Sequence, residues 1–224
     1  MEKRNDIIAM DGPAGSGKST VAAILAKDLD YLYFDTGVMY RAVTLYALQA
    51  NVDIVDEAKV TALAEKAVID VRDASVEDGR QYDVLLNNED VTWKIREKSV
   101  EAFVSPVSTY AGVRKAMTAQ QRRIGLRGKV VMVGRDIGTV VLPEAGVKIY
   151  LDTTVEERAR RRVLELQQRG TPLSYEEILE NLKSRDQIDS NRKVAPLRMA
   201  EDAHYILTDG MSIPEVVNAV KKFL

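Results

Sequence analysis

The sequence predicts an α/β fold in which helices cover a mainly parallel sheet. Five short apolar runs, rich in β-branched residues, each end in polar residues or glycine. Segments with helix-start signals lie between several of these runs, and a glycine-rich loop joins the first run to the first helical segment. This alternation of strand and helix signals is typical of a doubly wound α/β domain.

Each strand candidate is a nearly continuous apolar run, which is the pattern of a strand covered on both faces. The first run covers residues 7–10 and stops at Asp11 and Gly12. Runs of the same kind predict the other strands, at residues 32–34, 130–133, 147–151 and 205–207. Because parallel strands end at one edge of a sheet, we expect the residues after these runs to meet there.

Helix signals lie between these runs. Residues 21–26 combine small and branched apolar side chains, which suits a buried helix after the glycine-rich loop. Ser174 with Glu177, and Ser212 with Glu215, have the spacing of a capping box, in which side chains satisfy free backbone N–H groups at a helix start. Residues 153–162 predict a further capped helix with a basic surface.

One stretch breaks the alternation. Residues 68–72 and 82–86 alternate loosely between apolar and polar side chains, and Asp78-Gly79 between them is a turn signal. The pattern predicts a small antiparallel ribbon, inserted into the α/β domain between about residues 68 and 96.

Composition excludes several classes of protein. The 224 residues fit one large domain at roughly 150 residues per domain. With 32 Lys and Arg against 34 Asp and Glu, the chain lacks the excess of cations that a wrapping nucleic-acid binder needs. The absence of cysteine excludes disulfides and thiolate zinc sites. No apolar stretch approaches the roughly 20 residues of a membrane span. We therefore expect a cytoplasmic protein without nucleic-acid or membrane partners and, as no coiled coil is indicated, a monomer.

The loop after the first strand fits the pattern GxxxxGKS of a phosphate-binding loop. Small residues let successive backbone N–H groups point at a phosphate, and the following helix adds the positive end of its dipole. Lys18 is suited to the β- and γ-phosphates of a nucleotide, and the Ser19 hydroxyl to Mg²⁺. The alternative is an ordinary glycine turn before a helix. The predicted nucleotide-binding residues are Gly12, Pro13, Ala14, Gly15, Ser16, Gly17, Lys18, Ser19 and Thr20.

The loop predicts binding of a nucleoside triphosphate but not the reaction. An Asn-Lys-x-Asp segment, which reads the base in GTPase switches, is absent from the sequence. A kinase would also need an acceptor site. Thr36, Tyr40 and Arg41, which follow the second strand, offer a hydroxyl, an aromatic ring and a guanidinium that can bind phosphate. A helix start with Asp35 or Thr36 as its cap is the alternative.

Two further polar blocks are candidates for the same crevice. Arg135 and Asp136 follow the strand at 130–133, where an acidic residue can support Mg²⁺ or bind a substrate; a surface turn is the alternative. Arg185, Asp189 and Arg192 have the i, i+4, i+7 spacing of one helix face. Taken alone, this spacing is more commonly that of a solvated face with ion pairs.

Together these blocks resemble the cytidylate kinase family, in the order GPAGSGKST, DTGVMYR, GRDIGTVV and RDQIDSNRKVAPL. The resemblance extends from about Asp11 to Pro196. It implies a P-loop nucleoside monophosphate kinase-like fold with a parallel sheet flanked by helices, a small β-containing insert and a helical lid. The implied regions are a core of residues 1–36, 106–152 and 193–224, a monophosphate-binding region at 37–105, and a lid at 153–172.

The resemblance also implies ATP with Mg²⁺ as the phosphoryl donor and CMP or dCMP as the acceptor. The positions that match the family's acceptor-site motifs are Thr36, Tyr40, Arg41, Ser105, Arg114, Arg135, Asp136, Arg185, Asp189 and Arg192. Ser105 and Arg114 would contribute to recognition of cytosine, although Ser108 offers a second hydroxyl nearby. Thr36 stands where family members often carry serine, and it keeps the hydroxyl.

Transfer of a phosphoryl group needs anions held in line and their charge neutralised, which suits a cluster of arginines around Lys18. We expect Lys18 and Arg135 to act there, together with two arginines of the lid helix. Arg158 and Arg162 lie at i and i+4, on one helix face, and residues 167–172 would form the turn of the lid. No histidine base is required, and the single histidine, His204, is expected to be structural.

Two other readings remain open at this point. The main competitor is another P-loop phosphotransferase that acts on AMP, UMP or shikimate. Adenylate kinases commonly carry an Asp-Gly-Phe-Pro-Arg segment, whereas the corresponding strand end here continues as Gly134-Arg135-Asp136. A nucleotide-dependent switch without enzyme activity is the other alternative, but it would not need separate acceptor blocks.

Overall fold

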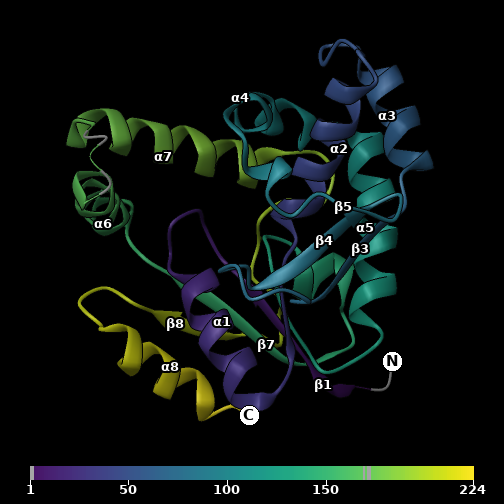
Figure 1. Cartoon of the computed structure of the whole chain (residues 1–224). Coiled ribbons are helices and arrows are strands. Elements are labelled where there is room, and N and C mark those ends of the chain that lie inside the picture. The colour runs from purple at the N-terminus through teal and green to yellow at the C-terminus, as the bar shows by residue number, and fades with distance from the viewer. Residues whose placement is uncertain (1–2, 169, 171–172) are drawn as a thin grey trace.

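A five-stranded parallel sheet forms the core of the molecule, a computed structural model that describes residues 3–168, 170 and 173–224 (Figure 1). The strands are β1 (Arg4–Asp11), β2 (Leu32–Asp35), β6 (Val130–Val133), β7 (Ala145–Asp152) and β8 (His204–Leu207). They lie in the order β2-β6-β1-β7-β8, and every pairing between neighbours is parallel. The five predicted strands and their parallel arrangement are confirmed.

The strands are continuous apolar runs because helices cover both faces of this sheet. All four residues of β6 are buried, and Ile7, Ile8 and Met10 of β1 are at most 1% exposed. Residues facing either side of these central strands meet helices rather than water, so neither face can be polar. Among the described residues, no helix has the length and apolar character needed to cross a membrane.

Eight α-helices and two short helical turns surround the described parts of the sheet. The helices are α1 (Lys18–Leu29), α2 (Gly37–Gln49), α3 (Glu57–Lys66), α4 (Lys98–Val107), α5 (Ala111–Gly125), α6 (Val155–Gln168), α7 (Tyr175–Asn191) and α8 (Ile213–Lys221). The turns are the 3₁₀ helix η1 (Lys94–Arg96) and the π-helical turn η2 (Ile137–Val141). The predicted Ser174–Glu177 capping box starts α7, with Glu177 N–H 3.1 Å from the Ser174 hydroxyl. Glu215 accepts from Ser212 N–H at the start of α8, 2.8 Å apart.

The predicted ribbon is a separate three-stranded antiparallel sheet. It consists of β3 (Ile69–Asp73), β4 (Tyr82–Leu86) and β5 (Glu89–Asp90). Together with α3, α4 and η1 it forms the insert, and α4 runs to Val107, two residues past the expected boundary at 105. The whole helix therefore belongs to the insert side.

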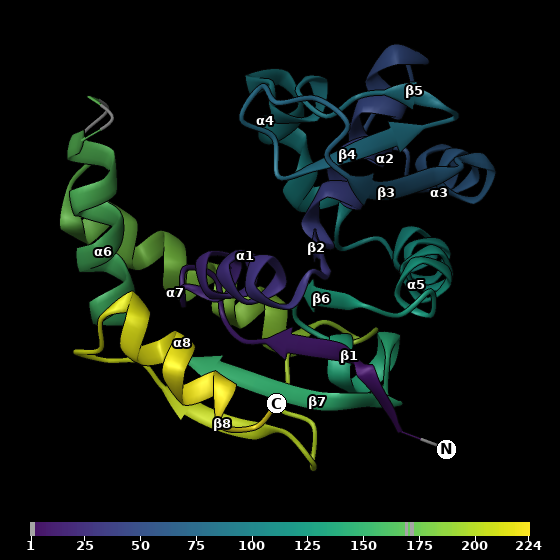
Figure 2. The ribbon, with the colours of Figure 1, turned by 60° about the horizontal axis from the view of Figure 1, so that its bottom comes forward.

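The second appendage is the pair of helices α6 and α7, which pack against each other. In Figure 2 this pair stands on one side of α1 and the insert on the other. The pair extends to Asn191, and the lid expected at 153–172 includes α6 but not α7. The turn expected at 167–172 lies partly outside the described residues.

Candidate functional site

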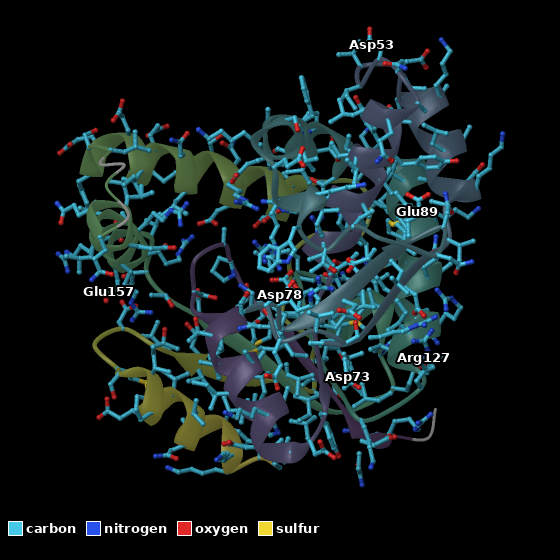
Figure 3. All side chains as sticks on the ribbon, in the orientation of Figure 1. Asp53, Asp73, Asp78, Glu89, Arg127 and Glu157 are labelled. Atoms are coloured by element: carbon cyan, nitrogen blue, oxygen red, sulfur yellow. The ribbon has the colours of Figure 1, made fainter. Side chains whose placement is uncertain are left out.

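A cleft of about 1320 Å³ opens between the insert, the sheet and the α6–α7 pair. Its floor is formed where the parallel strands end, by the loop before α1, residues 35–38 and residues 133–136. Residues of the insert line one side, and residues of α6 and α7 line the other. In Figure 3, the label of Asp78 marks the β3–β4 turn near the centre of the view, and Glu157 marks α6 at its left edge. The predicted site thus lies at the sheet edge where open α/β folds bind ligands.

The loop between β1 and α1 has the backbone of a phosphate-binding loop. Gly12 has φ +146°, and a Cβ there would lie 2.0 Å from the Leu151 carbonyl oxygen, so no other residue fits. Gly17, with φ +86°, directly precedes α1. The Lys18 ammonium donates to the Pro13 carbonyl (2.6 Å) and the Ser16 hydroxyl (3.1 Å). Burial, and then the charge of Arg135, lowers the pKa of Lys18.

Ser19 and Asp35 bring two oxygen ligands together at the mouth of this loop. The Ser19 hydroxyl donates to the Asp35 carboxylate, 3.0 Å away, and the other oxygen of that carboxylate accepts from Gly37 N–H. A hydroxyl and a carboxylate are hard oxygen donors of the kind that Mg²⁺ prefers. The pair therefore fits the magnesium ion expected at Ser19, and Asp35 is the partner that the sequence pattern did not single out.

Asp136 forms two buried ion pairs in the cleft. Its carboxylate accepts from Arg114 (3.0 Å) and from Arg192 (3.4 Å), and all three side chains are at most 10% exposed. The Arg114 guanidinium also lies over the Tyr40 ring, 5.5 Å from its centroid. Residues from three distant segments thus form one buried network, as expected if the separate polar blocks serve one site.

Arg135 and Asp189 form a second ion pair across the cleft. The Nε of Arg135 donates to the Asp189 carboxylate at 2.8 Å, and Arg192 donates to the other oxygen of that carboxylate at 3.2 Å. This contact joins α7 to the loop after β6. The i, i+4, i+7 spacing of the α7 residues therefore places Asp189 and Arg192 in the site, together with Arg185.

Arg185 lies in the cleft without a carboxylate within ion-pair distance in the described part of the chain. Its side chain is open to the cleft, yet desolvation by the cleft walls, followed by the charge of Arg135, lowers its pKa. Arg135 is paired with Asp189, whereas Arg185 has no carboxylate at ion-pair distance among the described residues, so Arg185 is the cation of the two that can accept an anionic ligand.

Residues after β2 line the floor of the cleft. The Thr36 hydroxyl donates to the Val133 carbonyl (2.9 Å), where Gly134 leaves room: a Cβ there would lie 2.8 Å from that hydroxyl. Thr36 also occupies the cap position of α2 without a side-chain capping bond. Arg41 projects from α2 into the cleft, with Glu101 3.8 Å away.

Ser105 and Ser108 both line the cleft, so both hydroxyls considered for base recognition are in place. The Ser108 hydroxyl donates to the Ser105 carbonyl at 2.7 Å, and the Ser108 carbonyl accepts from Arg114. The Ser105 hydroxyl has no hydrogen bond to the described residues. It is therefore the hydroxyl that remains available to a ligand.

The two expected lid arginines lie in different surroundings. Arg158 is 4% exposed, donates to the Ala14 carbonyl of the phosphate loop (3.0 Å), and pairs with Asp186 at 2.5 Å. The Arg162 side chain is 45% exposed, pairs with Glu165 at 2.7 Å and does not line the cleft. Arg161 does line the cleft and donates to the Thr208 carbonyl (2.8 Å), although sequence reasoning did not select it.

Asp11 is a further residue that sequence reasoning missed. Its buried carboxylate accepts from Ile137 and Gly138 N–H, both at 2.8 Å, and so holds the loop that follows Arg135 and Asp136. Burial raises the pKa of Asp11 to about 6, against the lowering effect of these two N–H groups. Its only sequence signal is its place at the end of a strand.

His204 begins β8 outside the cleft, and its ring stacks on Phe223 with centroids 3.9 Å apart. This contact agrees with the structural role expected for the single histidine.

Comparisons with known proteins agree with these motifs. The family model described as cytidylate kinase matches residues 8–224. The cytidylate kinase of Herpetosiphon aurantiacus is 50% identical over 213 residues, covering 95% of this chain and 91% of its own. That of Bacillus subtilis is 47% identical over 220 residues, covering 98% and 96%. A solved shikimate kinase from Acinetobacter baumannii, in complex with shikimate, aligns with a TM-score of 0.44 and 20% identity over 96% of this chain and 90% of its own. The chain belongs to the cytidylate kinase family.

Proposed function

We propose that this protein transfers the γ-phosphoryl group of ATP to CMP or dCMP, giving ADP and CDP or dCDP. The observation that carries the proposal is the shared cleft. A phosphate-binding loop lies in it beside a buried Arg–Asp network built from residues far apart in the chain. The names of the relatives point to the same acceptor.

The donor end of the cleft is formed by the loop before α1. Backbone N–H groups of this loop and the Lys18 ammonium bind the β- and γ-phosphates. Ser19 and Asp35 would hold Mg²⁺, whose charge offsets that of the transferring phosphoryl group. Arg161, Thr208 and Met211 line the far end of the same space and are the neighbours expected for the rest of the donor.

The acceptor base is assigned to the end of the cleft at Asp136. The exocyclic amine of cytosine can donate a hydrogen bond to a carboxylate. Its N3 and O2 atoms can accept hydrogen bonds from guanidinium and hydroxyl groups. Asp136, Arg114 and Ser105 supply these three groups. A buried site built of fixed donors and acceptors rejects a base that would leave them unpaired.

The reaction step needs little covalent catalysis by the protein, because positioning of the substrates and neutralisation of their charge lower the barrier. Lys18, Arg135 and Arg185 surround the space between the two ends of the cleft and offset the negative charge of the phosphates, which otherwise repel each other. The acceptor phosphate oxygen attacks the γ-phosphorus, the bond to the β-phosphate oxygen breaks, and ADP leaves. No side chain has to take a proton, because the attacking phosphate oxygen is already ionised.

Water must be kept from the γ-phosphate. We propose that α6 and α7 form the lid and close over both nucleotides, as enzymes of this kind do to exclude water. The Arg135–Asp189 and Arg158–Asp186 pairs link α7 to the floor of the cleft and to α6. Arg158 would then position the phosphate loop through Ala14, and Arg162 would approach the phosphates only on closure.

The test is acceptor-dependent ADP release. ATP with CMP or dCMP should release ADP rapidly, and ATP alone should release little. ADP release that is stimulated by AMP but not by CMP would favour another P-loop phosphotransferase. An ADP release rate that is the same with and without any acceptor would favour a nucleotide switch. Rates on CMP, dCMP and UMP, compared side by side, define the acceptor preference.

A further inference from the structure

The segment that carries Arg135 and Asp136 is attached at both of its ends to the end of β1. Before these two residues, Gly134 N–H donates to the Met10 carbonyl at 3.1 Å, directly after the last paired residues of β1 and β6. After them, the chain is held by Asp11, the residue that follows Met10 in β1. The backbone of Arg135 and Asp136 therefore lies between two attachments to consecutive residues of one strand.

The second attachment is made by the Asp11 carboxylate. One of its oxygens accepts from Ile137 N–H and the other from Gly138 N–H, each at 2.8 Å. These N–H groups begin the turn η2, where the free donors of a helix start need partners. A carboxylate suits them because both of its oxygens accept, whereas the amide of asparagine has one acceptor oxygen and presents a donor in place of the other.

Gly138 is packed closely between two side chains. A Cβ at this position would lie 3.4 Å from the Asp11 carboxylate and 3.2 Å from Cδ of Lys148. Lys148 is 6% exposed, and its ammonium is held by Asp202 at 2.8 Å. The segment after Asp136 is thus enclosed by Asp11 on one side and by the stem of Lys148 on the other, and it has little room to shift while both are in place.

Asp11 itself is 4% exposed and is not among the described residues that line the cleft. Burial raises its pKa to about 6, so at pH 7 the fold contains an ionised, buried carboxylate at a cost in stability. Costs of this kind are typical of functional sites. Because Asp11 does not reach the cleft, any effect on the reaction must act through the residues that it holds.

We propose that Asp11 is a positioning residue for phosphoryl transfer, whose two hydrogen bonds hold Arg135 and Asp136 in their places beside the phosphate-binding loop. The proposal deepens the function proposed above and rests on it. Gly12, the first residue of that loop, directly follows Asp11. The donor end and the acceptor end of the cleft therefore share one attachment point at the end of β1.

The test is Asp11→Asn, which keeps the size of the side chain and replaces one acceptor oxygen by a donor. With both nucleotides saturating, kcat should fall at least about tenfold, because a displacement of about 1 Å can cost a reaction about a hundredfold. The dissociation constant for CMP, measured by calorimetry, should rise about fivefold or more as Asp136 loses its precise placement. That for ATP should change less than about twofold, because the backbone of the phosphate-binding loop is unaltered.

A spectroscopic readout shows whether the two hydrogen bonds are lost. In ¹H–¹⁵N spectra of the ligand-free protein, the amide protons of Ile137 and Gly138 should move upfield in Asp11→Asn, because they no longer both donate to a charged acceptor. The variant is expected to fold, since the raised pKa means that the folded protein accepts the neutral form of this side chain. Shifted amide signals with unchanged kcat and CMP affinity would show a structural role alone and would overturn the proposal.

The matched control is Glu144→Gln. Glu144 is also a buried carboxylate, 9% exposed, and pairs at 2.7 Å with Arg122, which donates to the Val141 carbonyl at the far end of η2. Its loss should lower the free energy of unfolding and leave kcat and CMP affinity unchanged. The proposal fails if this control impairs the reaction as much as Asp11→Asn does, or if Asp11→Asn weakens only ATP. A wild type that binds CMP with this dependence on Asp11 but releases no ADP would refute the proposed function alone.

Discussion

At the scale of single residues, the cleft is built from charges that restrain one another. Asp136 holds Arg114 and Arg192, and Asp189 holds Arg135 and Arg192, so these guanidinium groups keep their directions before any ligand arrives. Such preorganisation lowers the entropy lost when a nucleotide binds. Arg185 and Arg96 have no such partner among the described residues and are the groups that gain most from a bound anion.

Lys18→Ala should abolish turnover and leave the fold intact. The loop is shaped by backbone geometry at Gly12 and Gly17, and the ammonium bonds only to Pro13 and Ser16 within it. Under the proposed function Lys18 stabilises the transferring phosphoryl group, so its removal should lower kcat at least about a hundredfold. The check is steady-state kinetics with circular dichroism. Lys27→Ala, an exposed change at the far end of α1, is the control, and equal activity of the two variants would refute the role of Lys18.

Asp136→Asn should damage acceptor binding more than donor binding. The substitution leaves Arg114 with a buried, uncompensated charge and removes the carboxylate assigned to cytosine. We expect a KM for CMP raised at least about tenfold, an unchanged KM for ATP, and a loss of about 3 kcal/mol in unfolding free energy. Asp28→Asn, which breaks the exposed Asp28–Lys221 pair, is the comparison. An unaltered KM and kcat for CMP would contradict the assignment.

At the scale of elements, the loops at the ends of the strands are fixed by contacts that are remote in sequence. The clearest case is Asp11, whose partners Ile137 and Gly138 follow more than a hundred residues later. They meet because β1 and β6 are neighbours in the sheet. A sequence pattern identifies Asp11 only as the end of a strand, because nothing local reveals which N–H groups it will meet.

The same reasoning explains which elements were predicted. The five strands were found because burial on both faces leaves an unbroken apolar run, and the capping boxes because their partners lie three residues apart. We did not predict α3 from the sequence, although Asp56 caps it by accepting from Lys59 N–H, nor α4 or the strand β5, which at two residues is too short to show an alternating pattern. Arg158 was expected to act on the phosphates from the lid helix, and the contacts with Ala14 and Asp186 that bury it come from other segments.

Asp11 also predicts a pH dependence of stability. Its pKa is raised to about 6 in the folded protein from 3.8, so the folded state holds the proton more tightly than the unfolded state. The resulting stabilisation is complete below about pH 4 and is lost as pH rises through 6, by about 3 kcal/mol. The check is the free energy of unfolding in urea, measured for the wild type and for Asp11→Asn from pH 4 to pH 7. The wild type should lose this stability relative to Asp11→Asn as the pH rises. A difference that does not vary with pH would contradict it.

At the scale of the whole molecule, a nearly neutral chain brings three cations without carboxylate partners into one cleft. The net charge is −2, yet Lys18, Arg96 and Arg185 line a single cleft without a carboxylate partner in the described region. Such a distribution favours small anionic ligands over extended polyanions, which would require a basic surface. The insert, the start of α1 and the α6–α7 pair each contribute one of these three cations, and Figure 2 shows these elements around α1.

The central claim is that ATP and CMP bind side by side in this cleft. It is tested most directly with a bisubstrate analogue, in which adenosine and cytidine are joined through their 5′ positions by a chain of five phosphates. Linking two ligands converts the second binding step into an intramolecular one. The account predicts one molecule bound per chain, at least about a hundredfold tighter than CMP, displaced by either nucleotide and weakened by both Lys18→Ala and Asp136→Asn. An analogue that binds no more tightly than ATP and does not compete with CMP would contradict it.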